Sequence, residues 1–394
     1  MTGIASSRSF TTVGLLLLAA CAASEDRGAD PKATSGTGDA GGGGATTSGP
    51  DGGMGGALGL GGLASGGTSS TGSGVPYGDP TICDDGIALT DADPLSAARA
   101  IELCQPSQDS PGLIEAKYVR ADGSPAPPTS ALQFGIMDNF GANVLPRAGN
   151  RMLVLSTGYA RIPGQPDICG SIMCSAGGQG VAPPGFPDNP PECTWSGSPP
   201  EYLTSIYDDI GLEVRLKAPD DATGYQFAFK LYSFEYPEFV CSPYNDQFVA
   251  LVDPPPMGAV KGNICFDGKK HPASVNLAFF DACDPAGIDR FAMSCVNAGG
   301  DCPPTPNPYC PKGMGELIGT GFESIWLASP WIGNEDGGAT AWLQTSAPVG
   351  GGEEVSIRFA IWDKADAIYD ATALIDRFEW LTGGGVEVDT DVPK

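Results

Sequence analysis

The chain has 394 residues and is strongly acidic, with 21 Lys and Arg against 47 Asp and Glu and a formal net charge of −26. It lacks the basic face that neutralises phosphates, so nucleic acid and a polybasic contact with anionic lipid are excluded as default partners. One histidine, His271, serves the whole chain, which excludes zinc sites with several imidazole ligands. This histidine lies in a hydrophilic turn beside Pro272, and no G-x-S-x-G motif occurs, so we predict no catalytic residues.

The N-terminus predicts export. Residues 11–20 form an apolar run with the length of a signal-peptide core, too short to span a bilayer as a helix. The run ends in Leu18-Ala-Ala-Cys21, the pattern of a bacterial lipobox, in which the cysteine thiol carries the diacylglycerol. An ordinary cleaved signal with a coincidental cysteine is the alternative. We predict a lipoprotein anchored to a membrane through Cys21, in the outer membrane or at the cell surface.

Composition divides the chain into four segments. Residues 1–20 are the predicted lipoprotein signal peptide. Residues 21–79 are predicted to be a disordered tether behind the lipidated cysteine, because Ser24 to Gly78 holds 20 glycines and no aromatic residue before Tyr77. Residues 80–381 are long enough to bury one large core and form the predicted domain. Residues 382–394 are predicted to be a flexible acidic tail.

The domain is predicted to be all-β. Asp93 as N-cap and Pro94 at the first helical position predict one short N-terminal helix that continues over 95–104. Period-2 runs broken by Gly and Pro loops are typical of an antiparallel β-sandwich, jelly-roll-like in outline. Segments rich in Cys, Pro and Gly at 163–200 and 283–315 are predicted to be loop insertions. The predicted strands cover residues 113–120, 151–156, 210–216, 225–232, 247–252, 274–280, 339–345, 354–362 and 373–380.

Cysteine usage also indicates an oxidising compartment. Cys21 is one of 12 cysteines, and the 11 that remain are an odd number, so at least one thiol stays free or pairs with another chain. Metal binding is the alternative to disulfides, but the spacings lack the paired C-x2-C of structural zinc. The connectivity stays open at this point. The candidate disulfides are Cys83/Cys104, Cys169/Cys174, Cys295/Cys302 and Cys302/Cys310.

Acidic residues gather where predicted strands end. Glu235 follows the strand predicted at 225–232, Asp246 precedes the one at 247–252, and Asp363, Asp366 and Asp370 lie between the last two strands. Carboxylates brought together at strand ends are oxygen ligands of the kind that Ca²⁺ takes in sixes to eights, so a calcium site is one prediction. The alternative is that these acids cap turns or coat the surface, since their spacing is not that of an EF-hand loop.

Several blocks of the domain together resemble the choice-of-anchor L domain, a module of bacterial surface proteins. The matching blocks lie in family order at residues 152–158, 233–238, 244–248, 319–322, 341–349 and 358–370. Phe234 and Ala371 depart from the family pattern, and each departure removes an oxygen ligand. The cysteine-rich lipoprotein form is similar to that of myxobacterial-type soil bacteria. The resemblance implies a surface-displayed β-sandwich with no established catalytic activity.

Three functions remain as hypotheses. The first is a non-enzymatic, lipid-anchored surface module for adhesion or for binding an unknown glycan or protein ligand, with calcium as a candidate stabiliser. The second is a carbohydrate-active hydrolase that uses a carboxylate pair such as Glu235 and Glu238, with Trp195, Trp326 and Trp331 as candidate sugar contacts. The third is a purely structural envelope lipoprotein.

Overall fold

The computed structural model divides the chain into two units, Met1–Gly66 and Gly67–Lys394, and every described residue belongs to the second. Among the described residues, no helix is both long enough and apolar enough to cross a membrane. The described residues are 75–76, 81–104, 111–188, 204–237, 239–240, 242–276, 279–284, 310–323, 328–329, 333–334 and 337–393.

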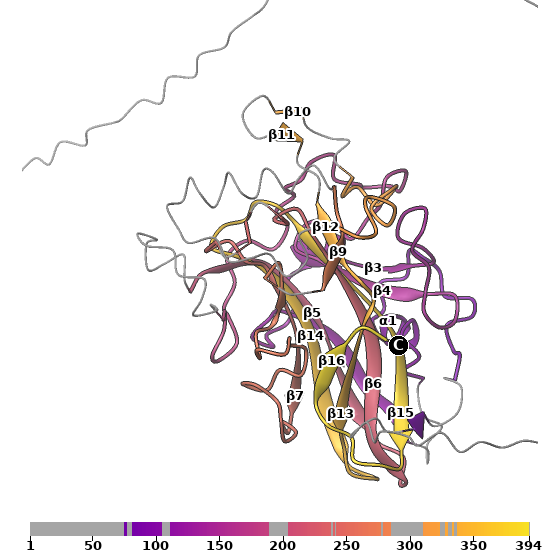
Figure 1. Cartoon of the computed structure of the whole chain (residues 1–394). Coiled ribbons are helices and arrows are strands. Elements are labelled where there is room, and N and C mark those ends of the chain that lie inside the picture. Colours follow the sequence, from indigo (N-terminus) through magenta and orange to yellow (C-terminus); the bar gives the residue numbers. More distant parts are fainter. Residues whose placement is uncertain are drawn as a thin grey trace, which may run out of the picture. The chain divides into compact units, whose positions relative to one another are not determined.

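Two antiparallel sheets form the folded unit, and Figure 1 shows their long strands running side by side. The first sheet has nine strands in the order β16-β13-β6-β15-β4-β3, with β1 paired to β15 and with β12 paired to β6 and β9. Its strands are β1 (Val75–Pro76), β3 (Phe134–Met137), β4 (Met152–Ser156), β6 (Ala222–Ser233), β9 (Phe280–Ala282), β12 (Gly338–Thr340), β13 (Leu343–Pro348), β15 (Ala371–Thr382) and β16 (Asp389–Asp391).

The second sheet has five strands in the order β2-β5-β14-β7-β8. A separate hairpin pairs β10 with β11, and the helical elements are α1 and the 3-10 helix η1. The bounds are β2 (Gly112–Val119), β5 (Ile206–Lys217), β7 (Gln247–Asp253), β8 (Ala273–Ser274), β14 (Glu354–Lys364), β10 (Ala328–Ser329), β11 (Gly333–Asn334), α1 (Pro94–Arg99) and η1 (Pro128–Leu132).

Aromatic side chains from the two sheets meet in one continuous core. Phe227 of β6 packs edge-on against Phe359 of β14 with ring centroids 5.0 Å apart, and Phe229 meets Phe248 of β7 at 5.1 Å. All four side chains are fully buried. Because alternate residues of each long strand point inward, the predicted period-2 runs supply both inner faces. The predicted all-β sandwich is confirmed.

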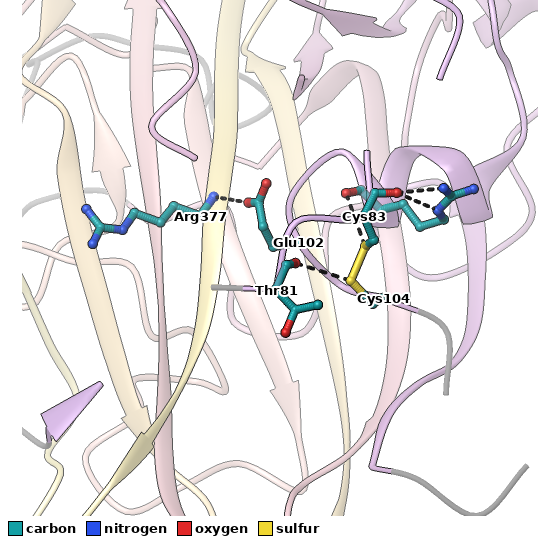
Figure 2. Close-up of a disulfide and its surroundings, with 6 residues drawn as sticks. Thr81, Cys83, Glu102, Cys104 and Arg377 are labelled. Atoms are coloured by element: carbon teal, nitrogen blue, oxygen red, sulfur yellow. Dashed lines mark hydrogen bonds between the residues drawn. A yellow bond between two sulfur atoms is a disulfide. The ribbon is translucent and has the colours of Figure 1, made fainter. Parts of the chain in front are cut away.

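Helix α1 begins as predicted but ends early. The Asp93 carboxylate accepts the backbone N–H of Leu95 at 3.0 Å, which is the predicted N-cap. The helix stops at Arg99 rather than continuing to Cys104, because Glu102 takes a backbone φ of 66°, outside the helical range. The predicted Cys83–Cys104 disulfide then ties the end of this segment to the chain before the helix, as Figure 2 shows.

The structure corrects two predicted strands. Residues 274–280 are not one strand, because the Ser274 hydroxyl accepts the N–H of Asn276 in a turn, after which the chain passes from β8 in one sheet to β9 in the other. The run 339–345 is divided into β12 and β13, both paired with β6. The break follows Thr340, whose hydroxyl accepts the Leu231 N–H in place of a ladder bond.

Both ends of the folded unit add strands that the sequence did not predict. Val75 and Pro76, within the predicted tether, pair with Thr382 and Leu381 at the end of β15. Within the predicted flexible tail, β16 pairs with β13, and the buried Thr390 hydroxyl lies 2.8 Å from that of Thr345. Short strand β3 was missed as well.

The cysteine pairing is partly as predicted. Cys169–Cys174 forms, whereas Cys310 pairs with Cys283 instead of Cys302, which corrects that candidate. Cys295 and Cys302 lie outside the described residues. Cys265 is a free, fully buried thiol whose Sγ lies 3.5 Å from the Thr345 hydroxyl, in keeping with the odd cysteine count.

We predict that Phe359→Ala lowers the free energy of unfolding by about 3–5 kcal/mol, because it removes the ring that joins both sheets and leaves a cavity. Phe359→Leu keeps most of the volume and should cost less than half as much. Denaturant unfolding of the oxidised protein measures both. Equal losses for the two variants would contradict a close-packed contact at this ring.

Candidate functional site

The predicted acidic residues lie at one end of the sandwich, which we call the acidic end. Here β6 and β14 end while β5, β7 and β15 begin, since Ala371 pairs with Ser233, Lys364 with Ile206 and Trp362 with Gln247. Glu235, Asp246 and Asp363 are each 1% exposed and Asp370 is 6% exposed, whereas Asp366 is half-buried. The antiparallel topology therefore gathers acids from two connections, β6–β7 and β14–β15, and from the end of β14.

Glu235 and Asp246 are joined through the backbone. The Asp246 N–H donates to Glu235 Oε2 at 3.0 Å, and the Lys364 N–H donates to Asp246 Oδ1 at 3.1 Å. Asp246 Oδ2 and both amide atoms of buried Asn245 have no hydrogen-bond partner among the described residues. Both oxygens of Asp363 also lack a hydrogen bond of ordinary geometry, and burial raises the Asp363 pKa although the nearby Thr157 hydroxyl partly opposes this rise.

Lys364 supplies the buried positive charge of this cluster. Its Nζ donates to the Pro243 carbonyl, and the side chain is 1% exposed. Burial lowers the pKa of Lys364 to about 8, against the opposing influence of Glu235 and Asp246. One ammonium cannot balance all the surrounding carboxylates, so further neutralisation is required.

Protons are one source of that neutralisation. Burial, with the Asp366 charge, raises the pKa of Glu235 to about 8, and burial raises that of Asp370 to about 7. Burial also raises the pKa of Asp246, with help from Glu235, and the pKa of Asp363, with help from Asp370. These mutual effects show that the acids share one electrostatic environment.

A part of the predicted loop insertion 163–200 covers two carboxylates here, a contact that was not predicted. We call residues Cys174–Gly180 the strap. The Cys174 N–H contacts both oxygens of Asp370 at 3.1 and 3.0 Å. Asp208 Oδ1 accepts the Ser175 hydroxyl at 3.0 Å and then three successive backbone N–H groups at 3.2, 2.7 and 2.6 Å. The available signal in the sequence was the adjacent pair Asp208 and Asp209 near the start of β5, together with a Gly-rich segment elsewhere in the chain whose backbone N–H groups are free to donate.

The five predicted ligands form a charge cluster but do not converge on one point. Oxygen atoms bound to a single Ca²⁺ lie within about 5 Å of one another, given bond lengths of about 2.3–2.6 Å. Among the described residues, the group of three that meets a 4.8 Å limit is Cys169, Cys174 and Asp370. Two of these are joined in a disulfide, so calcium binding stays a prediction.

A small pocket opens beside Asp370. Phe234, stacked on Phe322 at 4.4 Å, forms its apolar side, and Arg161, Thr320 and Cys169 contribute polar atoms. The free volume is about 40 Å³, room for a few water molecules. Phe234 departs from the family pattern described in the sequence analysis, and its ring forms part of the apolar wall of this pocket.

A second buried acid group lies beside α1 and was not predicted. Glu102 Oε2 accepts the Arg377 N–H at 2.9 Å, as Figure 2 shows, while Asp376 accepts the same N–H at 2.6 Å. Burial and the Asp376 charge raise the pKa of Glu102 to about 10, and burial raises that of Asp376 to about 7. These acids dock the disulfide-braced segment onto β15.

Several sequence candidates lie outside the described residues: Cys21, Glu238, Trp195, Trp326 and Trp331. His271 is more buried than its predicted solvated turn implied, with Nδ1 3.8 Å from Asp267. Comparison with protein-family models, curated proteins and solved structures finds no match to this chain.

We predict that the free energy of unfolding falls as the pH rises from about 5 to 8. The folded-state pKa values of Glu235, Asp370 and Asp376 lie above their unfolded values, so the folded state holds more protons in this range. Above about pH 8, Lys364 opposes the trend because its pKa is lowered.

Chemical denaturation across this pH range measures how the free energy of unfolding changes with pH. Glu235→Gln should make this slope less steep and raise the free energy of unfolding near pH 8. The amide keeps an acceptor for the Asp246 N–H and removes the charge. Exposed Glu354, changed to Gln, is the control and should leave the slope unaltered. A slope of the opposite sign would contradict buried, proton-retaining acids.

Proposed function

We propose that this chain is an exported, lipid-anchored and non-enzymatic display module whose acidic end binds a glycan or protein at the cell envelope. The disulfides suit an oxidising, exported environment. The lipid anchor follows from the lipobox at Cys21 and the resemblance to a surface module, and both remain predictions from sequence.

One observation carries the proposal: the chain enters the folded unit at the end remote from the acidic end. Strand β1 pairs with Leu381 and Thr382, whereas Asp370 precedes the first residue of the same strand β15. Twelve residues of strand at about 3.3 Å each separate the two ends by roughly 35 Å. The chain that leads into β1 therefore joins the folded unit at the end opposite the acidic end, and this junction leaves the loops of the acidic end uncovered.

Exposed apolar side chains accompany the pocket at this end. Met173, Ile318 and Ile368 are 46%, 51% and 38% exposed, and each lies within two residues of a residue that lines the pocket. An apolar surface beside polar pocket groups is typical of protein and ligand contacts. These features favour recognition by the loops of this end.

Burial of the acids favours binding over hydrolysis. A glycosidase needs two carboxyl groups in contact with the sugar. Glu235 and Asp246 are covered by protein, and the neighbouring pocket of about 40 Å³ is too small to enclose a sugar ring. Surface contact with an extended ligand fits this geometry better than enclosure of a substrate.

To test binding, we expect the triple variant Met173→Ser, Ile318→Ser and Ile368→Ser to lose saturable binding in a screen of envelope glycans and surface proteins. The expected loss is at least tenfold in affinity, because interface energy concentrates in few apolar contacts. Met257→Ser is the matched control, since Met257 is 93% exposed but does not line the pocket. Undiminished binding by the triple variant, or turnover of a glycan by the wild type, would sink the proposal.

Calcium remains part of the proposal as a stabiliser of the acidic end. We expect calcium to raise the unfolding midpoint relative to excess chelator, and to do so more at pH 8.5 than at pH 6, because a higher pH removes the protons that compete for carboxylates such as Glu235 and Asp370. Asp246→Asn should abolish the calcium effect, whereas Glu354→Gln should preserve it. Identical midpoints with calcium and chelator at both pH values would leave protons and Lys364 as the neutralising groups.

A further inference from the structure

The three disulfides of the described residues differ in the loops that they close. Cys83–Cys104 spans 21 positions and Cys283–Cys310 spans 27, whereas Cys169–Cys174 spans only 5. Stabilisation by a disulfide grows with the length of the closed loop, so the shortest loop contributes least to the global fold. The Cys169–Cys174 bond is therefore not required as a main brace of the sandwich.

Access distinguishes this bond from Cys283–Cys310, because Cys283 and Cys310 are 0% and 3% exposed whereas Cys169 and Cys174 are half-buried. Cys83 and Cys104 are half-buried as well, but they do not line the small pocket. Cys169 lines the small pocket together with Arg161 and Thr320, so this pocket is the candidate route for a small thiol to the disulfide. Thiol exchange requires access of this kind to one sulfur of the disulfide.

The same disulfide adjoins the strap. Cys174 is both a disulfide partner and the first strap residue, and its N–H holds Asp370. The following donors hold Asp208, and the Gly180 N–H donates to the Ile206 carbonyl at 2.9 Å. Opening the disulfide removes the covalent restraint at the point where this series of hydrogen bonds begins. The strap donates to Asp370 and Asp208, which are 6% and 1% exposed.

We propose that Cys169–Cys174 is an exchangeable disulfide, opened by a small thiol through the pocket, and that its opening loosens the strap over Asp370 and Asp208. This inference goes beyond the proposed binding function and does not depend on it. The pairing, the pocket and the strap hydrogen bonds carry it.

The reaction balances with two thiol molecules as the reductant. One thiolate attacks Cys169 Sγ, a mixed disulfide forms, and Cys174 leaves as a thiolate. A second thiolate attacks the small-molecule sulfur of that mixed disulfide, which releases the oxidised thiol dimer and the Cys169 thiolate. The two protons given up by the thiols return to the two cysteines, so the protein gains two electrons and two protons.

The first test treats the full-length mature protein with 2-mercaptoethanol under native conditions, followed by alkylation and peptide mass spectrometry. We expect Cys169–Cys174 to open at least about tenfold faster than Cys283–Cys310, while Cys265 stays unmodified because the core remains closed. Simultaneous opening of both bonds, together with alkylation of Cys265, would mean that reduction requires global unfolding and would overturn the proposal.

The second test measures hydrogen exchange at the strap. Amides 176–178 should exchange at least about tenfold faster after mild reduction, and the double variant Cys169→Ser, Cys174→Ser should show the same increase without thiol. The matched double variant Cys83→Ser, Cys104→Ser should leave these amides unchanged. Unaltered protection at 176–178 in the reduced wild type would overturn the coupling even if the bond opens.

Discussion

A carboxylate removed from water must receive hydrogen bonds, a counter-charge or a proton, and this constraint governs two places in the sandwich, the acidic end and the side where α1 docks. At the acidic end, Asp208 and Asp370 receive backbone N–H groups of the strap, and Lys364 supplies one buried cation near Glu235 and Asp246. The conformation of the strap is restricted, because its backbone N–H groups donate to buried acids. This long loop is thus held in a defined position against the sheets.

On the side of the sandwich where α1 packs, buried carboxylates again accept backbone N–H groups, and here they attach the helix segment to β15. Glu102 and Asp376 converge on the Arg377 N–H at a point where the register of β15 against β6 is interrupted. The irregular strand frees a donor that a regular ladder would use. The helix segment, held by Cys83–Cys104, docks on that donor while Ile101 and neighbouring residues enter the core. The disulfide, the acid pair and the irregularity in β15 together hold the helix segment against the sheet.

Sequence reasoning succeeded where periodicity is strong and local. The long strands β5, β6, β14 and β15 follow from alternation, and the cap at Asp93 follows from short-range chemistry. The gathering of Glu235, Asp246 and Asp370 at one end also follows, since antiparallel strand ends must meet there. Each of these inferences needs only the residues of one element or of adjacent elements.

The features that were not predicted depend on contacts between residues distant in sequence. Whether 274–280 stays in one sheet depends on its partners, β7 and β12, and the pairing of Cys310 with Cys283 depends on a loop closed in three dimensions. The strap reaches Asp208 across about 30 positions, and no local pattern indicates that these N–H groups donate to a carboxylate. Buried charge compensation was therefore the least predictable part of the site.

The isolated thiol of Cys265 has a consequence for how the oxidised protein matures. Burial raises its pKa to about 12, so almost no thiolate exists at neutral pH, and the side chain is fully enclosed. Disulfide scrambling requires a thiolate as attacking group. Once the sheets have closed, the one unpaired cysteine of the described core can no longer shuffle the finished bonds, so the packed interior preserves the pairing that it encloses.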